Sequence, residues 1–153
     1  MPDYRRLFKS CGSNVVIDDN VFIENPQRIE VDDNVRFDRG FYMQDGPAVC
    51  RIGSNVRFYP NCFIQGEGGR LIIADHVDFF PNTYISTGDA QSSIEIGHHS
   101  HFAPSCVLYG WGGLRIGPYC NIAAHCVFAS IGHDQVIRDK PMALVGACRG
   151  PIT

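Results

Sequence analysis

The sequence predicts an all-β protein built from short strands that repeat along nearly the whole chain. A similar segment recurs about every 20 residues, apolar and polar residues alternate within each segment, and Gly, Pro, Asn and Asp separate the alternating runs. Alternation indicates a strand with one buried face, and these four residues favour tight turns. The apolar spacing of an amphipathic helix is missing from most of the chain, and only a short segment from Tyr4 to Lys9 is a helix candidate.

The composition is that of an ordinary soluble domain. The chain has 153 residues, enough for one domain with a core, and its 44% hydrophobic and 19% charged residues exclude a disordered chain. A net charge of -3 without a clustered basic face argues against nucleic acid as a partner. No apolar run reaches the roughly 18 residues of a transmembrane segment, and no signal peptide is recognisable. We therefore expect a cytoplasmic protein.

The repeat is clearest when six segments are aligned on an aliphatic residue at their start. The anchors are separated by 14, 21, 21, 23 and 20 residues and are Ile17, Val31, Ile52, Ile73, Ile96 and Ile116. Six positions after the last five anchors stand Phe37, Phe58, Phe79, Phe102 and Ile122. Four positions further stand Phe41, Cys62, Thr83, Cys106 and Cys126. Self-similarity of this kind predicts a solenoid, in which equivalent residues of successive coils stack.

The shared unit is aliphatic-Gly-x-x-small-x, as in IGSNVRF and IGPYCNI, and it is the hexapeptide repeat. The chain resembles the hexapeptide-repeat superfamily from about residue 11 to its end. The resemblance implies a left-handed parallel β-helix, a triangular prism with three short strands per coil. The coils here take 20 to 23 residues, a few more than three six-residue units require. The extra residues predict Gly-rich loops along one prism edge, at 44–50, 65–70, 86–93 and 109–113.

Two columns of small residues are expected inside the prism. The first contains Cys62, Thr83, Cys106 and Cys126, and the second contains Val56, Val77, Ser100 and Cys120. A free cysteine in such a column behaves as a small apolar residue, so we interpret these cysteines as interior filling rather than reactive thiols. The seven cysteines form no CxxC pair, which gives neither a zinc-ribbon nor a thioredoxin pattern.

The histidines suggest two kinds of site. His98, His99 and His101 form the cluster HHSH, which could be a metal site. We favour the interpretation that His98 and His99 occupy a solvated corner, because Ser54-Asn55 and Asp75-His76 hold the same positions in other coils.

The regular pattern ends at Gly132-His133-Asp134, where about 20 residues without the repeat begin. The segment IGPYCNIAAHCVFASIGHD resembles sugar-modifying hexapeptide acetyltransferases, in which a coil leads into an excursion with GHD or GHP. RRLFKSCGSNVVIDDNVFI likewise resembles the start of polysaccharide and lipopolysaccharide O-acetyltransferases. The resemblance implies an acetyl-CoA-dependent O-acetyltransferase with His133 as general base, and Asp134 is a candidate to orient its imidazole. Histidine can accept the proton of an attacking sugar hydroxyl at neutral pH.

Four further residues are candidates for substrate binding. Ser105 stands where family members often place an asparagine near the reacting groups. Tyr109 and Trp111 lie in the Gly-rich loop LYGWGGL and could form either a sugar-stacking platform or a lid over the prism edge. His125 occupies a corner of the coil that leads into the excursion. The resemblance also implies a homotrimer whose active sites lie between neighbouring prisms.

The last residues, 150–153, look like the start of a further coil, whereas related acetyltransferases continue with several coils that carry much of the coenzyme A groove. We therefore predict one domain over 1–153, with regular coils over 11–130, an excursion over 131–150 and apparently missing C-terminal coils. One alternative is a truncated or non-catalytic β-helix module for binding or assembly. A more distant alternative is a zinc hydratase like the γ-class carbonic anhydrases. That class uses an H-x4-H pair, which this chain lacks, so we predict no metal site.

Overall fold

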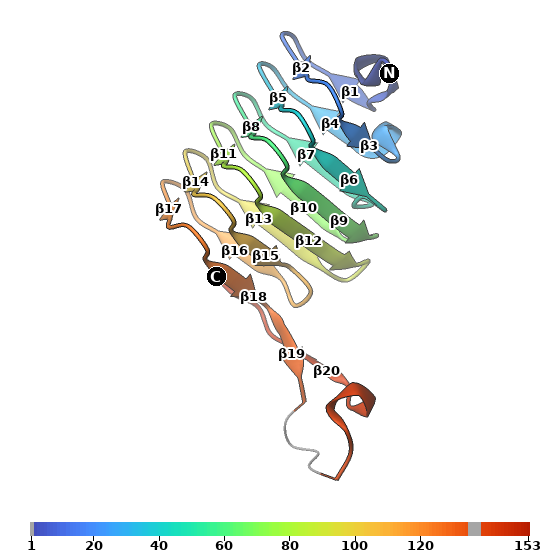
Figure 1. The fold of residues 1–153 in the computed structure, drawn as a ribbon, viewed down its shortest axis with the longest axis vertical. Coiled ribbons are helices and arrows are strands. Elements are labelled where there is room, and N and C mark those ends of the chain that lie inside the picture. Colours follow the sequence, from blue (N-terminus) through green and yellow to red (C-terminus); the bar gives the residue numbers. More distant parts are fainter. Residues whose placement is uncertain (1, 135–138) are drawn as a thin grey trace.

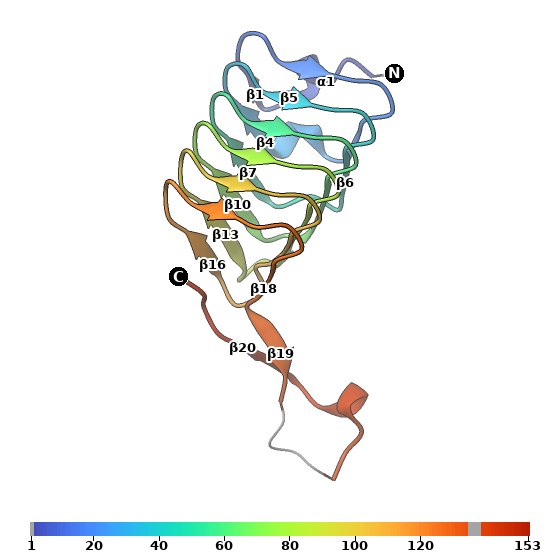
Figure 2. The same ribbon diagram turned by 60° about the vertical axis from the view of Figure 1, so that its left-hand side comes forward.

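The protein is a parallel β-solenoid in a computed structural model that describes residues 2–134 and 139–153. The coils stack along one axis, with the N-terminus at one end and a projecting hairpin at the other (Figure 1). Each coil contributes one strand to each of three six-stranded parallel sheets. Figure 2 shows the stacked coils and the projecting hairpin from a second direction.

The first sheet contains β1 (Ser10–Cys11), β4 (Ile29–Val31), β7 (Val49–Ile52), β10 (Arg70–Ile73), β13 (Ser93–Ile96) and β16 (Leu114–Ile116). The second contains β2 (Val16–Ile17), β5 (Arg36–Phe37), β8 (Arg57–Phe58), β11 (Asp78–Phe79), β14 (His101–Phe102) and β17 (Asn121–Ile122). The third contains β3 (Phe22–Ile23), β6 (Tyr42–Gln44), β9 (Phe63–Glu67), β12 (Tyr84–Asp89), β15 (Val107–Tyr109) and β18 (Val127–Ala129). A separate hairpin pairs β19 (Ile131–His133) with β20 (Ala147–Arg149) in antiparallel fashion.

The interior consists of columns of equivalent residues, as the repeat predicts. Phe37, Phe58, Phe79 and Phe102 are all 0% exposed and stack at centroid distances of 5.0 to 5.3 Å with interplanar angles of 4° to 12°. The predicted columns of small residues are also interior, with Cys62, Thr83 and Cys106 buried. Cys120 and Cys126 are only partly buried because they belong to the last coil and have no coil stacked beyond them among the described residues.

The alignment of the first coil differs from the sequence-based one. Ile17 pairs with Phe37 in the second sheet, and Cys11 pairs with Val31 in the first sheet. The first anchor is therefore Cys11, which makes the spacing to Val31 similar to that of the later coils. Cys11 stands where the other anchors have an aliphatic residue, so the sequence alignment did not identify it as the first anchor.

The prism corners use the left-handed backbone conformation at equivalent positions of successive coils. Asn55, His76 and His99 have φ angles of 59°, 57° and 56° at one corner, as the corner interpretation of the histidines requires. At the next corner the residues with positive φ are Asn20, Gly40, Asn61, Asn82, Ser105 and His125. Asparagine and glycine tolerate this conformation better than other residues, which explains why they recur at the corners.

The elements outside the repeat differ in detail from the expected ones. The helix α1 (Tyr4–Leu7) ends before Phe8, which has an extended backbone and is buried in the core. The extra residues of the third and fourth coils are partly strand, because β9 and β12 extend far enough to pair Glu67 with Asp89. Two short 3-10 helices, η1 (Pro26–Arg28) and η2 (Met142–Leu144), complete the described structure. Within the described part of the chain, no helix is long and apolar enough to cross a bilayer.

Candidate active site at the end of the solenoid

The excursion leaves the solenoid directly from the third sheet. Strand β18 ends at Ala129, Ser130 follows, and β19 then extends away from the prism (Figures 1 and 2). In the hairpin, Ile131 lies opposite Arg149 and His133 lies opposite Ala147, and the Asp134 amide donates to the Gly146 carbonyl at 3.0 Å. The hairpin therefore holds His133 two residues beyond Ile131, the first residue of β19, which is about 7 Å along an extended strand.

Ser130 fixes the base of the hairpin to the solenoid. Its side chain is buried at 3% exposure, and its hydroxyl donates to the Tyr109 carbonyl at 2.7 Å while accepting the Gly112 amide at 2.9 Å. The Gly150 amide donates to the Ser130 carbonyl at 3.1 Å, which brings the two ends of the excursion together. A Cβ at Gly112 would lie 2.3 Å from the Ser130 carbonyl oxygen, so this close approach requires glycine.

Arg149 forms a second attachment between the hairpin and the solenoid. Its guanidinium lies 2.8 Å from an Asp89 carboxylate oxygen, 5.3 Å from the Trp111 ring centroid, and 3.4 Å from the Trp111 carbonyl, to which it donates. The Arg149 hydrogen bond, followed by that of Ser92, lowers the pKa of Asp89 to about 2. Asp89 is therefore ionised at neutral pH and available to pair with the Arg149 guanidinium.

Tyr109 and Trp111 lie together at a small cavity beside this attachment. The cavity has a volume of about 120 Å³, and its other side chains include Gln65, Tyr84 and Ser86. The Trp111 indole N–H donates to the Ser86 hydroxyl at 3.1 Å, and the Tyr84 hydroxyl donates to the Gln65 side-chain oxygen at 2.7 Å. Aromatic surfaces with a few hydrogen-bonding groups are a common composition of small-molecule sites.

Ser105 and His125 lie elsewhere. Both have positive φ angles at the corner that precedes the third sheet, with Ser105 before β15 and His125 before β18. Tyr109 is the last residue of β15, and His133 follows β18. The strands of the third sheet therefore separate Ser105 and His125 from the cavity and from the hairpin. Tyr109 and Trp111 therefore lie together at the cavity, whereas Ser105 and His125 lie apart from it.

His133 is exposed, and its imidazole has no hydrogen-bond or ion-pair partner among residues 2–134 and 139–153. Asp134 follows it at the end of β19, and consecutive residues of an extended strand point to opposite sides. Sequence adjacency alone therefore does not direct a carboxylate onto a neighbouring imidazole. Residues 135–138 of the predicted excursion lie outside the described residues.

Four histidines, His76, His98, His99 and His101, lie close together at the corner between the first and second sheets and on the second sheet. The His98 and His99 Nδ1 atoms are 3.0 Å apart, His76 stacks on His99 at 4.5 Å, and His101 pairs with Asp78 at 3.0 Å. In the portion of the chain that is described, no group of three or more His, Cys, Asp or Glu side chains could hold a metal ion. These histidines thus contact one another and Asp78.

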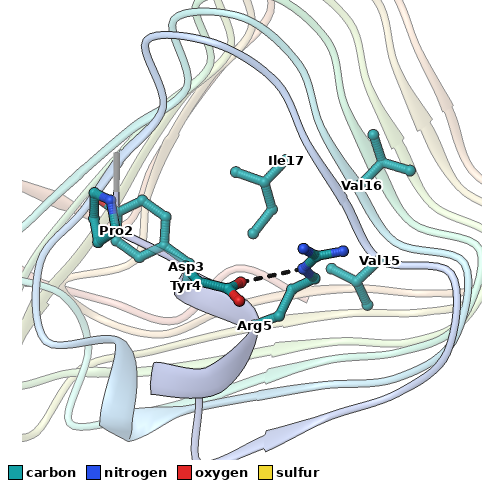
Figure 3. A pocket seen from close by; sticks show the side chains of 7 residues that line it. All are labelled: Pro2, Asp3, Tyr4, Arg5, Val15, Val16 and Ile17. Atoms are coloured by element: carbon teal, nitrogen blue, oxygen red, sulfur yellow. Dashed lines mark hydrogen bonds and ion pairs between the residues drawn. The ribbon is translucent and has the colours of Figure 1, made fainter.

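A larger cavity, of about 520 Å³, lies at the opposite end of the solenoid (Figure 3). It lies between α1 and the first coil, and Val15 and Ile17 form its apolar side. Arg5 donates to Asp3 at 3.2 Å at its edge, the interaction drawn in the figure. The cavity is far from the hairpin along the chain and the axis, and the Tyr4 hydroxyl that lines it accepts the Ile23 amide at 3.2 Å.

Sequence reasoning missed several residues of the hairpin base: Gln65, Tyr84, Ser86, Asp89, Ser130 and Arg149. The repeat could have placed Tyr84 on the outer side of the third sheet, because it precedes an interior residue. Arg149 and Ser130 carry no such signal, since the segment between them departs from the repeat.

Comparisons with known proteins agree with the fold. No family model and no curated protein matches the sequence. A crystal structure of a hexapeptide-repeat-containing acetyltransferase from Vibrio cholerae matches with a TM-score of 0.62 and 18% identity, over 79% of this chain and 72% of that chain. This likeness shows that the chain has the β-solenoid fold of a hexapeptide-repeat acetyltransferase.

Proposed function

We propose that the protein is an acetyl-CoA-dependent O-acetyltransferase that acts on a sugar hydroxyl in the synthesis of a surface polysaccharide or lipopolysaccharide. The observation that carries the proposal is the hairpin itself. A rigid solenoid presents one imidazole, that of His133, on a projection whose base is fixed beside the aromatic cavity of Tyr84, Tyr109 and Trp111. The match to an acetyltransferase of the same fold supports an acyl-transfer activity.

In the proposed reaction the sugar lies against the aromatic cavity and His133 acts as general base. The imidazole accepts the hydroxyl proton as the sugar oxygen attacks the thioester carbonyl carbon of acetyl-CoA. A new carbon–oxygen bond forms, the carbon–sulfur bond breaks, and the proton passes from the imidazole to the leaving thiolate. The products are an acetylated sugar and coenzyme A.

We also propose that the protein acts as a homotrimer in the cytoplasm, where acetyl-CoA would be its donor. The support for a multimer is that the hairpin extends away from its own solenoid and that its strand β20 is exposed along its length. A neighbouring copy would cover the hairpin, exclude water from the imidazole and complete the donor site. Sedimentation analysis of the full chain measures this assembly directly.

The first prediction tests whether His133 is the general base. His133→Ala should retain the fold and reduce acetyl transfer about 100-fold or more, because no other described group replaces the imidazole. The assay follows coenzyme A release from acetyl-CoA with glucose, galactose, mannose and N-acetylglucosamine and their oligomers as acceptors. His101→Ala is the matched control, because it also removes an exposed histidine from a strand.

Near-full activity in His133→Ala would exclude His133 as the base. Calorimetric titration with acetyl-CoA separates the enzyme from a non-catalytic module. An absence of both heat and acetyl transfer would favour the module, whereas binding without transfer to any acceptor tested would contradict the proposed sugar specificity.

A further inference from the structure

The three outer faces of the prism differ sharply in chemistry. On the first sheet the outward column is Ser10, Glu30, Arg51, Ile72, Glu95 and Arg115, and on the second it is Val16, Arg36, Arg57, Asp78, His101 and Asn121. The corresponding column on the third sheet is Phe22, Tyr42, Phe63, Tyr84, Val107 and Val127. Only this third column is apolar along its whole length. We call Phe22, Tyr42, Phe63 and Tyr84 the outer aromatic column.

The outer aromatic column is arranged differently from the interior phenylalanines. Interior rings lie nearly parallel, so each ring face is covered by the next ring. In the outer column only Phe22 and Tyr42 are near parallel, at 21°, whereas Tyr42 and Phe63 meet at 66° and Phe63 and Tyr84 at 56°. Phe22 and Tyr42, the near-parallel pair, are 42% and 41% exposed, and Phe63 and Tyr84 are partly exposed. The column is thus a partly exposed aromatic surface, or platform, rather than interior filling.

Polar groups accompany the rings. The next outward column of the third sheet contains Gln44, Gln65, Ser86 and Tyr109, in register across four coils. Gln65 uses its side-chain oxygen to accept from Tyr84, and within the described residues its amide nitrogen and the Tyr109 hydroxyl have no protein partner. The platform therefore offers hydrogen-bond donors and acceptors beside partly exposed aromatic rings.

This platform leads to the cavity beside the hairpin base. Tyr84 belongs both to the outer aromatic column and to the cavity that contains Tyr109 and Trp111. From Phe22 to Tyr109 the platform crosses four strand spacings, about 19 Å, which exceeds the length of a single sugar ring. A sugar ligand that fills it therefore has to be a chain of several units.

We propose that the acceptor is an extended saccharide chain, which lies along the outer aromatic column and presents one of its units at the cavity. The inference rests on the proposed function for the acceptor being a sugar, and it adds that the enzyme recognises several consecutive units. A sugar ring combines apolar C–H faces, which stack on aromatic rings, with hydroxyls at its edge, which hydrogen-bond to amides and phenols. The platform offers both kinds of partner side by side, whereas the other two outer faces offer ion pairs.

Binding by the full chain tests the proposal without acetyl-CoA. Trp111 is the only tryptophan in the sequence and lies at the cavity, so its fluorescence reports ligand binding there. The probes are glucose, galactose, mannose and N-acetylglucosamine, each as monosaccharide and as linear oligomers up to the hexasaccharide. In at least one series the hexasaccharide should bind about tenfold more tightly than the monosaccharide, since each extra stacking contact contributes to affinity.

Variants of the outer aromatic column test whether the saccharide chain binds along it. Phe22→Ala combined with Tyr42→Ala should weaken hexasaccharide binding about tenfold and leave monosaccharide binding unchanged, because these rings are remote from the cavity. Val16→Ala combined with Ile72→Ala, on the other two outer faces, is the matched control and should change neither affinity. If the alanine pair fails to fold, Phe22→Leu with Tyr42→Leu removes the rings while keeping apolar bulk.

Three results would overturn the proposal: affinity that does not depend on chain length in any series, no binding of any probe, or a loss of oligomeric mass in the Phe22–Tyr42 variants. The last result would identify the outer aromatic column as a contact between copies. The acetyl-transfer assay separates this outcome from failure of the proposed function. Transfer without dependence on chain length refutes only the extended site, whereas length-dependent binding without transfer refutes only the activity.

Discussion

The solenoid and the β19–β20 hairpin are held in place by different kinds of interaction. In the solenoid each coil adds residues to buried columns, such as the phenylalanines of the second sheet, and pairs its strands in parallel with those of the adjacent coils. The hairpin buries little apolar surface, and its described attachments are polar contacts at Ser130, Gly150 and Arg149. The solenoid is therefore the scaffold, and the hairpin is a projection that it holds in place. The stability of each region can be tested separately.

The largest effect is expected for a break in the interior column. Phe58 is 0% exposed and contacts the rings of Phe37, Phe41 and Phe79. Phe58→Ala leaves a cavity in the middle of the solenoid and should lower the free energy of unfolding by about 3–5 kcal/mol. Chemical denaturation measures this change.

The control for that experiment is Tyr42→Ala on the outer face of the third sheet. Tyr42 is 41% exposed, so its removal should cost roughly 1 kcal/mol. Equal losses for the two variants would contradict the distinction between interior filling and outer platform.

A smaller effect is expected at the corners. Asn20 has a φ of 58° and is exposed, so its backbone conformation is the main constraint at this position. Asn20→Val forces a β-branched residue into the left-handed region and should destabilise the protein by roughly 1–2 kcal/mol, whereas Asn20→Gly should be nearly neutral. Thermal unfolding of the two variants compares them, and a loss with glycine as large as with valine would exclude the conformational explanation.

The smallest global effect is expected at the hairpin attachment. The depressed pKa of Asp89 means that its contribution is present above the unfolded carboxyl pKa, about 3.9, and is lost as pH falls toward the folded value of about 2. Arg149→Met should therefore loosen the hairpin at neutral pH as acid does in the wild type. Hydrogen exchange should quicken at 131–133 and 147–149 and stay unchanged in the solenoid strands.

Arg115→Met is the matched control for this last variant, because it removes an exposed arginine from the last strand of the first sheet. Faster exchange across all three sheets in Arg149→Met would show that the hairpin attachment also stabilises the solenoid, and the two regions would then not be separable.

Most of the solenoid could be predicted because the repeat encodes it several times. Residues such as Cys62 and Cys106 occupy equivalent positions in sequence and therefore in space, and the same argument placed His99 at a corner. The first coil was misaligned because Cys11 stands where later coils have an aliphatic residue. The short helix was placed correctly at its start, but the burial of Phe8 ends it early.

The candidate site could be predicted only in part. Tyr109 and Trp111 lie in a loop that the repeat locates, and the structure places them at one cavity. The Arg149–Asp89 pair joins residues 60 positions apart, one of which lies outside the repeat, and no periodic signal connects them. Ser105 and His125 share the corner that the repeat assigns to them, but this corner is at the other end of the third-sheet strands.

The way the chain returns from the hairpin has a consequence for how such a protein can change. The Gly150 amide meets the Ser130 carbonyl at 3.1 Å, and Ile152 then pairs in parallel with Leu114, in step with the first sheet. The two ends of the excursion are therefore neighbours, and the coil register is the same before and after it. Because closing a longer or shorter loop between adjacent ends costs little free energy, we expect the protein to tolerate insertions and exchanges there. The excursion can therefore differ in length and sequence without a change in the coils that carry it.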